Sequence, residues 1–275
     1  MIASNKTNIT KSIYGIVGSM KFESRKRLGQ NFLISEAVAR AEAVHASGKA
    51  VLEIGPGKGM LTKELCRYAK KVIAVEKDQR LYAFLRSTLQ MKNLELINAD
   101  FFAVQWPAHV INSIDIVIAN IPYNLSSRTI SWLFTNNKSA VLCLQKEFVE
   151  HMTAPEGTRN YSRLSVMCAL SFNIIEIMHV PRSSFNPVPK VDSTIVLIKP
   201  KKLRISADEY NIINLLMQHK KKTLRNAIID SAPELGDTRR LQDYIAKNDC
   251  SERVFKMTPD EILEISRNLE ALQKL

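Results

Sequence analysis

The chain has 275 residues, 45% of them hydrophobic, and a formal net charge of +12 at pH 7. This length allows one large domain, or a domain of roughly 180 residues with a smaller one. The basic balance favours a polyanionic partner, either a nucleic acid or an anionic membrane. No apolar run approaches the roughly 18 residues of a membrane span. The apolar run at residues 13–17 is too short to be the core of a secretory signal. The sequence therefore predicts a cytoplasmic location and no membrane partner.

The four cysteines lie far apart and form no Cys-x-x-Cys pair. A structural metal site is therefore not predicted, and reduced, buried thiols are the expected state. Residues 1–20 are polar and show no period, which predicts a flexible tail.

From residue 50 onward, short apolar runs typical of strands alternate with segments of helical period. The predicted strands are 50–54, 72–75, 94–97, 114–119 and 140–144, and the predicted helices are 60–69, 78–91, 127–134 and 147–153. This alternation indicates an α/β fold with a parallel sheet and right-handed crossovers. A further helix, capped by Ser35, is expected over 36–41.

The later part of the chain has a different pattern. Late strands are predicted at 174–180 and 194–198, joined by a loop that prolines stiffen at 185–193. After residue 205 the predicted elements are all helices, at 208–219, 223–230, 238–246 and 259–271. A boundary near residue 200 therefore divides residues 21–199 from a small helical domain, residues 200–275.

The turn after the first of these strands carries Glu53-x-Gly55-x-Gly57-x-Gly59. Glycines let the backbone approach a ligand closely, and the helix that follows offers unpaired amides. A dinucleotide fingerprint would have its third glycine one place later. A nucleoside without phosphates fits better, and S-adenosyl-L-methionine is the commonest such cofactor.

Two acids follow the next two strands. Glu76 ends the second strand, where a carboxylate would accept both ribose hydroxyls. Asp100 lies just past the third strand and could accept the amino group of the cofactor adenine. Each alone is commonly a helix cap, but features at three consecutive strand ends together predict a cofactor site.

The fourth strand is followed by Asn120-Ile121-Pro122-Tyr123. One interpretation is a packed, proline-containing turn. The other is a loop that holds an adenine while its exocyclic nitrogen is methylated, with Asn120 and a turn carbonyl accepting the N6 hydrogens and Tyr123 stacking on the base. Positioning and electrostatics would then supply the rate.

Positive charge is concentrated between Lys199 and Arg225, a stretch with eight Lys and Arg residues and only two acidic residues. A solvated surface is the ordinary interpretation of such a run, and a nucleic-acid footprint is the alternative. A membrane-surface role is disfavoured, because residues 220–225 offer little apolar anchor beside the charge.

These motifs together resemble the ribosomal RNA adenine N6-dimethyltransferase family, from about Arg25 to the end of the chain. The resemblance implies a Rossmann-like class I S-adenosylmethionine-dependent methyltransferase fold. Residues 26–33 resemble the family's amino-terminal segment, which implies that Asn31 and Leu33 touch the cofactor, although many members have histidine in place of Asn31. Phe185 resembles the aromatic that sandwiches the target base opposite Tyr123.

Residues 145–147, 160–166 and 220–226 resemble the branch that acts on small-subunit ribosomal RNA. That resemblance implies methylation of two adjacent adenosines in a terminal hairpin loop, within an assembling small subunit, by a monomer. Phosphate contacts are then expected from the basic stretch. They are assigned to four residues: Lys220, Lys221, Lys222 and Arg225.

Two alternatives remain open at this point. The first is a large-subunit methylase of the antibiotic-resistance type, which normally lacks those three stretches. The second is a non-catalytic ribosome-assembly or transcription factor on the same fold.

Overall fold

The computed structural model describes residues 30–203 and 205–273; the expected tail and residues 26–29 lie outside this description. The described chain forms two compact units. A sheet unit contains residues 30–146 and 175–198, and a helical unit contains residues 147–174 and those from 199 onward. The sequence pattern predicts residues 147–174 to be part of the sheet domain. They belong to the helical unit because hydrogen bonds tie them to it, including Tyr161 Oη to the Met257 carbonyl at 2.9 Å.

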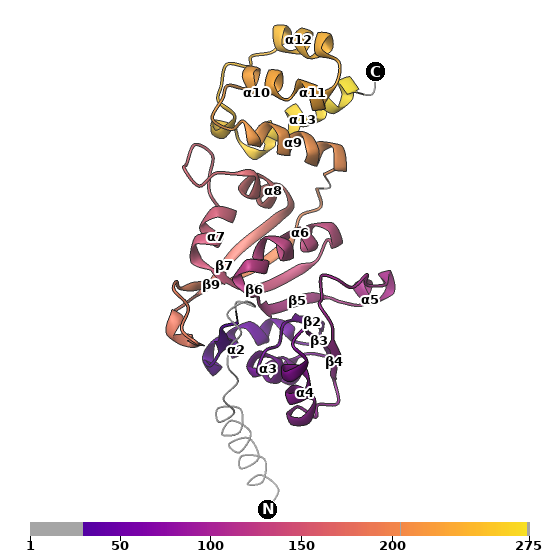
Figure 1. Ribbon diagram of the computed structural model, residues 1–275, viewed down its shortest axis with the longest axis vertical. Helices are drawn as coiled ribbons and strands as arrows, with labels where there is room; N and C mark the ends of the chain where they lie inside the picture. The colour runs from indigo at the N-terminus through magenta and orange to yellow at the C-terminus, as the bar shows by residue number, and fades with distance from the viewer. Residues whose placement is uncertain (1–29, 204, 274–275) are drawn as a thin grey trace, which may run out of the picture. The chain divides into compact units, whose positions relative to one another are not determined.

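The sheet unit is built on seven strands in the order β4-β3-β2-β5-β6-β9-β7 (Figure 1). Their bounds are β2 (Ala50–Ile54), β3 (Lys71–Glu76), β4 (Leu94–Asn98), β5 (Ile116–Asn120), β6 (Ser139–Gln145), β7 (Phe172–Val180) and β9 (Ser193–Pro200). The pairs β4–β3, β3–β2, β2–β5 and β5–β6 are parallel, whereas β6 and β9 are antiparallel. The predicted α/β class is confirmed, with a sheet that is mixed at this edge.

Helices follow the strands of the sheet unit as the sequence period predicts. They are α2 (Glu36–Ala43), α3 (Met60–Tyr68), α4 (Gln79–Thr88), α5 (Ala108–Asn112) and α6 (Ser126–Asn136), with 3-10 turns at Val44–Ala46, Tyr123–Leu125 and Arg182–Ser184. The Ser35 side chain accepts a hydrogen bond from the Val38 amide, which confirms the predicted N-cap of α2. The five-residue α5 was not predicted, because one turn is too short to show a period.

A second, very small sheet joins two distant segments of the sheet unit. Strand β1 (Phe32–Leu33) pairs antiparallel with β8 (Phe185–Asn186), and Leu33 lies opposite Phe185. The Ile34 amide extends the pairing by donating to the Ser184 carbonyl at 2.9 Å. The sequence predicted only a loop here, because two residues are too few to show strand alternation.

The helical unit contains the remaining helices. They are α7 (Lys146–Met152), α8 (Arg163–Ser171), α9 (Ala207–Gln218), α10 (Leu224–Asp230), α11 (Ala232–Leu235), α12 (Thr238–Lys247) and α13 (Pro259–Gln273), with a 3-10 turn at Val254–Lys256. Helices α9 and α13 pack together through fully buried side chains such as Ile213 and Leu269. An ion pair of 2.7 Å between Glu209 and Arg267 joins the same helices. No helix in the described part of the chain is long and apolar enough to cross a membrane.

Candidate active site

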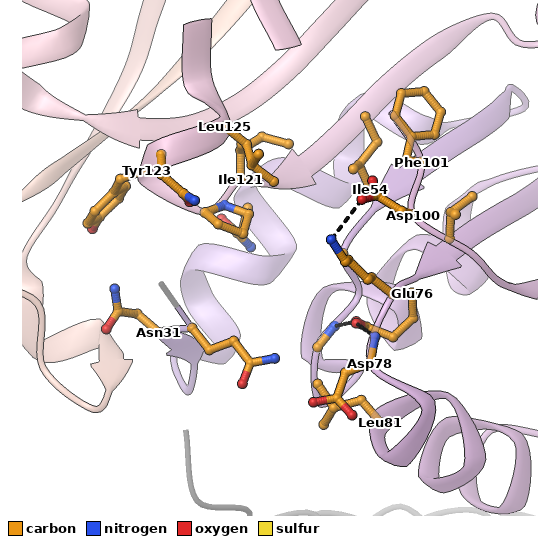
Figure 2. A pocket seen from close by; sticks show the side chains of 18 of the residues that line it. Asn31, Ile54, Glu76, Asp78, Leu81, Asp100, Phe101, Ile121, Tyr123 and Leu125 are labelled. Atoms are coloured by element: carbon orange, nitrogen blue, oxygen red, sulfur yellow. Dashed lines mark hydrogen bonds and ion pairs between the residues drawn. The ribbon is translucent and has the colours of Figure 1, made fainter. Parts of the chain in front are cut away.

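A pocket of about 390 Å³ opens in the sheet unit at the carboxyl ends of the parallel strands. Ligands bind at this edge in open α/β sheets. The strand order brings together polar groups that follow four strands: Asp100 after β4, Glu76 at the end of β3, Gly55 and Gly57 after β2, and Asn120 at the end of β5. In Figure 2, Asn31 and Tyr123 lie on one side of this pocket, and Glu76, Asp78 and Asp100 lie on the other.

The glycine turn after β2 needs the conformations that only glycine adopts readily. Gly55 and Gly57 have φ angles of 70° and 59°. The Gly57 amide donates to Glu76 Oε2 at 3.0 Å, so the turn is tied to the end of β3. Gly59 has a different purpose: a Cβ there would lie 2.6 Å from a Leu85 methyl carbon and 2.8 Å from one of Leu89. Gly59 therefore allows close packing of α3 on α4 and does not line the pocket.

We call the side formed by Glu76 and Asp100 the carboxylate wall. Glu76 is 5% exposed, and its second oxygen accepts the Asp78 amide at 2.8 Å. Burial raises the pKa of Glu76, while the hydrogen bonds from backbone amides oppose that rise. Asp100 is more exposed and forms a 2.7 Å ion pair with Lys77 (Figure 2). The hydrogen bond from Lys77 lowers the pKa of Asp100.

We call the opposite side, residues 120–123, the amide wall. The Asn120 amide nitrogen donates to Glu42 Oε2 at 3.1 Å. Asn120 Oδ1 is buried and has no hydrogen-bond partner among the described residues. The Tyr123 hydroxyl lies 2.9 Å from Ser193 Oγ, a fully buried side chain of β9, so the ring is held from its polar end.

Two other residues expected at the site also line the pocket, namely Asn31 and Phe185. Two do not. Leu33 packs in the core opposite Phe185 in the small sheet. Glu53 is 1% exposed beneath the glycine turn, and burial raises its pKa to about 8, with a further contribution from the charge of Glu76. Side chains alternate along a strand, so Glu53 is turned away from the side on which its neighbour Ile54 lines the pocket.

The sequence did not single out the apolar part of the pocket wall. This part consists of strand-end and loop side chains, chiefly Ile54, Val75, Leu81 and Phe101. Their positions in the sequence give one indication of this role. Each of these side chains lies within one or two residues of a predicted site residue, or in the first turn of the next helix. Apolar side chains at such positions are equally typical of an ordinary core, so the sequence alone could not assign them.

The pocket fits S-adenosyl-L-methionine by size and by chemistry. Its volume lies in the range of about 300–1,000 Å³ usual for small-molecule sites. Apolar side chains suit an adenine ring, Glu76 suits ribose hydroxyls, and Asp100 suits the adenine amino group. The buried, unpartnered Asn120 Oδ1 adds an acceptor on the wall opposite.

Strand order and pocket position define the class I S-adenosylmethionine-dependent methyltransferase fold. Among solved structures, the chain is similar to a dimethyladenosine transferase from Plasmodium falciparum, with a TM-score of 0.75 and 28% identity over 87% of this chain and 98% of that one. It is also similar to the 23S rRNA methyltransferase ErmE, with a TM-score of 0.64 and 26% identity over 87% of this chain and 100% of that one.

The family model described as "Ribosomal RNA adenine dimethylase" matches residues 21–270. A curated relative from Pyrococcus abyssi, named probable ribosomal RNA small subunit methyltransferase A, is 40% identical over 88% of this chain and 91% of its own length. A relative of the same name from Methanopyrus kandleri is 36% identical over 95% of both chains. The chain therefore belongs to the ribosomal RNA adenine dimethylase family. Its activity is S-adenosylmethionine-dependent dimethylation of adenine in ribosomal RNA.

Proposed function

We propose that the protein dimethylates N6 of two adjacent adenosines in the 3'-terminal hairpin loop of small-subunit ribosomal RNA. It acts as a monomer on an assembling small subunit, in the cytoplasm where that subunit matures. The unpartnered, buried acceptor of Asn120 carries the chemical part of this proposal. The names of the relatives, at 36–40% identity over most of the chain, favour the small subunit as substrate.

The target N6 amine is a poor nucleophile because its lone pair is delocalised into the adenine ring. Asn120 Oδ1 and a carbonyl of the following turn accept its hydrogens and favour the pyramidal amine. When bound, S-adenosylmethionine supplies the electrophilic methyl group. The N6 proton becomes acidic as the new bond forms and is then lost to water, so a strong base is not needed. Positioning and preorganised dipoles provide the acceleration.

Two aromatic rings on the pocket wall hold the target base. Tyr123 is fixed through its hydroxyl by Ser193. Phe185 is 4% exposed, lines the same pocket and is held by its pairing with Leu33. Aromatic stacking of this kind suits a base that is unpaired or flipped out of a loop.

Among the four basic residues assigned to phosphate contacts, the structure separates two groups. The Lys220 ammonium donates to the Tyr161 carbonyl, and Lys222 pairs with Asp230. Lys221 and Arg225 are exposed on the same unit, as is Lys222 beside its partner Asp230. Lys221 and Arg225 are therefore proposed as the phosphate contacts, and Lys220 and Lys222 as residues that hold the fold.

Labelled S-adenosylmethionine, the purified protein and small subunits that lack the modification test the substrate. Incorporation mapped to N6-dimethyladenosine at two adjacent positions is the expected result. Asn120→Ala should lower the rate roughly 10²–10³-fold, as loss of a preorganised hydrogen-bonding group does in other enzymes. Large subunits assayed in parallel serve as the competing substrate, because ErmE acts on 23S rRNA. Methylation of large subunits alone would refute the proposal.

A salt titration of RNA binding tests the phosphate contacts. Replacing both Lys221 and Arg225 by alanine should reduce the slope of log affinity against log salt by about 1.4–1.8, since each neutralised phosphate contributes roughly 0.7–0.9. Lys247→Ala, at an exposed lysine of α12, is the matched control and should leave the slope unchanged. An unchanged slope in the double variant would contradict the assignment.

A further inference from the structure

Glu42 is a buried carboxyl in contact with the site. It lies on α2, is 0% exposed, and its neighbours on the buried face of that helix are apolar: Val38, Ala39 and Ala43. One of its oxygens accepts the hydrogen bond from Asn120, and the other has no hydrogen-bond partner among the described residues. An unsatisfied buried polar atom costs on the order of 1–3 kcal/mol. An apolar side chain would avoid that cost, so stability does not account for this glutamate.

The contact fixes which end of the Asn120 amide is engaged by Glu42 and which end stays unpartnered. An asparagine amide has almost the same shape in its two flipped orientations but opposite hydrogen-bonding character. With an acceptor behind it, the nitrogen turns toward Glu42, and Oδ1 stays free for a donor. The flipped amide would present two donors to the target N6 group, which is itself a donor, and the base would lose its alignment.

We infer that Glu42 is a positioning residue, which holds the Asn120 amide with its oxygen toward the target base. This inference rests on the proposed role of Asn120 and adds a residue on α2 to the machinery that orients N6. Glu42 itself touches neither the base nor the reacting atoms.

The ionisation state of Glu42 matters for this role. Burial raises its pKa to about 8, and the charge of Glu53 on β2 adds to the rise. Cys143 on β6 is the other titratable neighbour, and its own pKa is raised by burial and by Glu42. On the neighbouring α3, Lys63 interacts with Glu36 in the first turn of α2. Ionised Glu42 only accepts, whereas the protonated acid can also donate to Oδ1 and so permits the flipped amide. Methyl transfer should therefore accelerate as pH rises through about 8.

Single-turnover methylation by Glu42→Leu and Glu42→Gln variants of the full chain tests the inference. Glu42→Leu should lower the rate roughly 10–100-fold, because the amide is freed but not removed, which is less severe than losing the group itself. Its cofactor Kd should stay within about threefold, and its melting temperature should change little, because removing the unsatisfied Glu42 oxygen offsets the loss of the acceptor for the Asn120 amide. Glu42→Gln resembles the protonated acid, which can donate as well as accept, so its rate should match that of the unchanged protein below pH 8 and should lack the rise near pH 8.

Glu64→Leu is the matched control. Glu64 is also a buried glutamate of the sheet unit, but it pairs with Arg67 at 2.8 Å and does not line the pocket. Its rate per folded molecule should equal that of the unchanged protein. Wild-type turnover by Glu42→Leu, or a pH rise that persists in Glu42→Gln, would overturn the inference; the second readout decides if Glu42→Leu does not fold. An inactive Asn120→Ala beside an active Glu42→Leu would refute the role of Glu42 alone, whereas an active Asn120→Ala would refute the proposed chemistry.

Discussion

The polar groups on the two walls of the pocket differ in how fully they are hydrogen-bonded. On the carboxylate wall, Glu76 accepts two backbone amides, and Asp100 is engaged by Lys77 and by the Phe102 amide. On the amide wall, the Asn120 oxygen is buried and left without a partner among the described residues. The first wall is held in shape before any ligand arrives. The second retains an unsatisfied acceptor, whose cost is recovered only when a donor occupies the pocket.

Glu76→Ala should have the largest effect on the carboxylate wall. It leaves two backbone amides without an acceptor and removes the group expected to bind ribose. Hydrogen bonds to charged groups contribute about 1.5–3 kcal/mol each, so the cofactor Kd should rise about 100-fold or more. Calorimetric titration measures it, with Glu76→Gln, which keeps one acceptor oxygen, as a milder control. A Kd within threefold of the original would mean that the wall does not hold the cofactor.

Tyr123→Ala should impair methylation of RNA without changing cofactor binding, and so distinguish the roles of the two walls. Loss of one stacking partner is worth about 1–3 kcal/mol per base, which lowers kcat/KM for RNA roughly 10–100-fold. The cofactor Kd should stay within about threefold, since the carboxylate wall is unchanged. Steady-state kinetics with RNA varied, beside a cofactor titration, measures both quantities. Equal losses in the two would show that the walls are not separate.

The Tyr123–Ser193 contact sharpens the role of the ring. Ser193→Ala and Tyr123→Phe each remove one partner of a single hydrogen bond, worth about 0.5–1.5 kcal/mol, so each should cost a few-fold in kcat/KM. In a double-mutant cycle the second change should add little to the first. Fully additive losses would mean that Ser193 does not hold the tyrosine.

Lys77→Met should have the smallest effect. The pKa of Asp100 is lowered mainly by the hydrogen bond from Lys77. A lowered pKa stabilises the fold at pH values above the pKa of the unfolded chain, and this contribution is lost as pH falls through the folded pKa. The variant should therefore lose slightly less stability on acidification than the original. Denaturant unfolding at pH 7 and at acid pH measures the difference, and a larger acid loss in the variant would contradict the assigned cause.

The sequence anticipated the groups that lie immediately after recognisable strands. Glu76, Asp100 and Asn120 each follow an apolar run, and strand order alone brings such positions to one edge. The role of Glu42 could not be predicted from the sequence, because nothing in the local pattern distinguishes an acid on a buried helix face from a solvated one. Its role depends on a partner 78 residues away, Asn120. Leu33, which the resemblance predicts to touch the cofactor, lies in the core opposite Phe185 and does not line the pocket.

The small β1–β8 sheet also constrains the order in which contacts can form while the chain is synthesised. Strand β1 is made early, yet its partner residues, Phe185 and Asn186, emerge only after more than half of the protein. Ser193, which holds Tyr123, follows a few residues later. Contacts so distant in sequence form late in folding, because loop closure must precede them. The nascent sheet can therefore begin to fold before the target-base pocket closes, but its core is completed only when Val180, Phe185 and Ile195 join it.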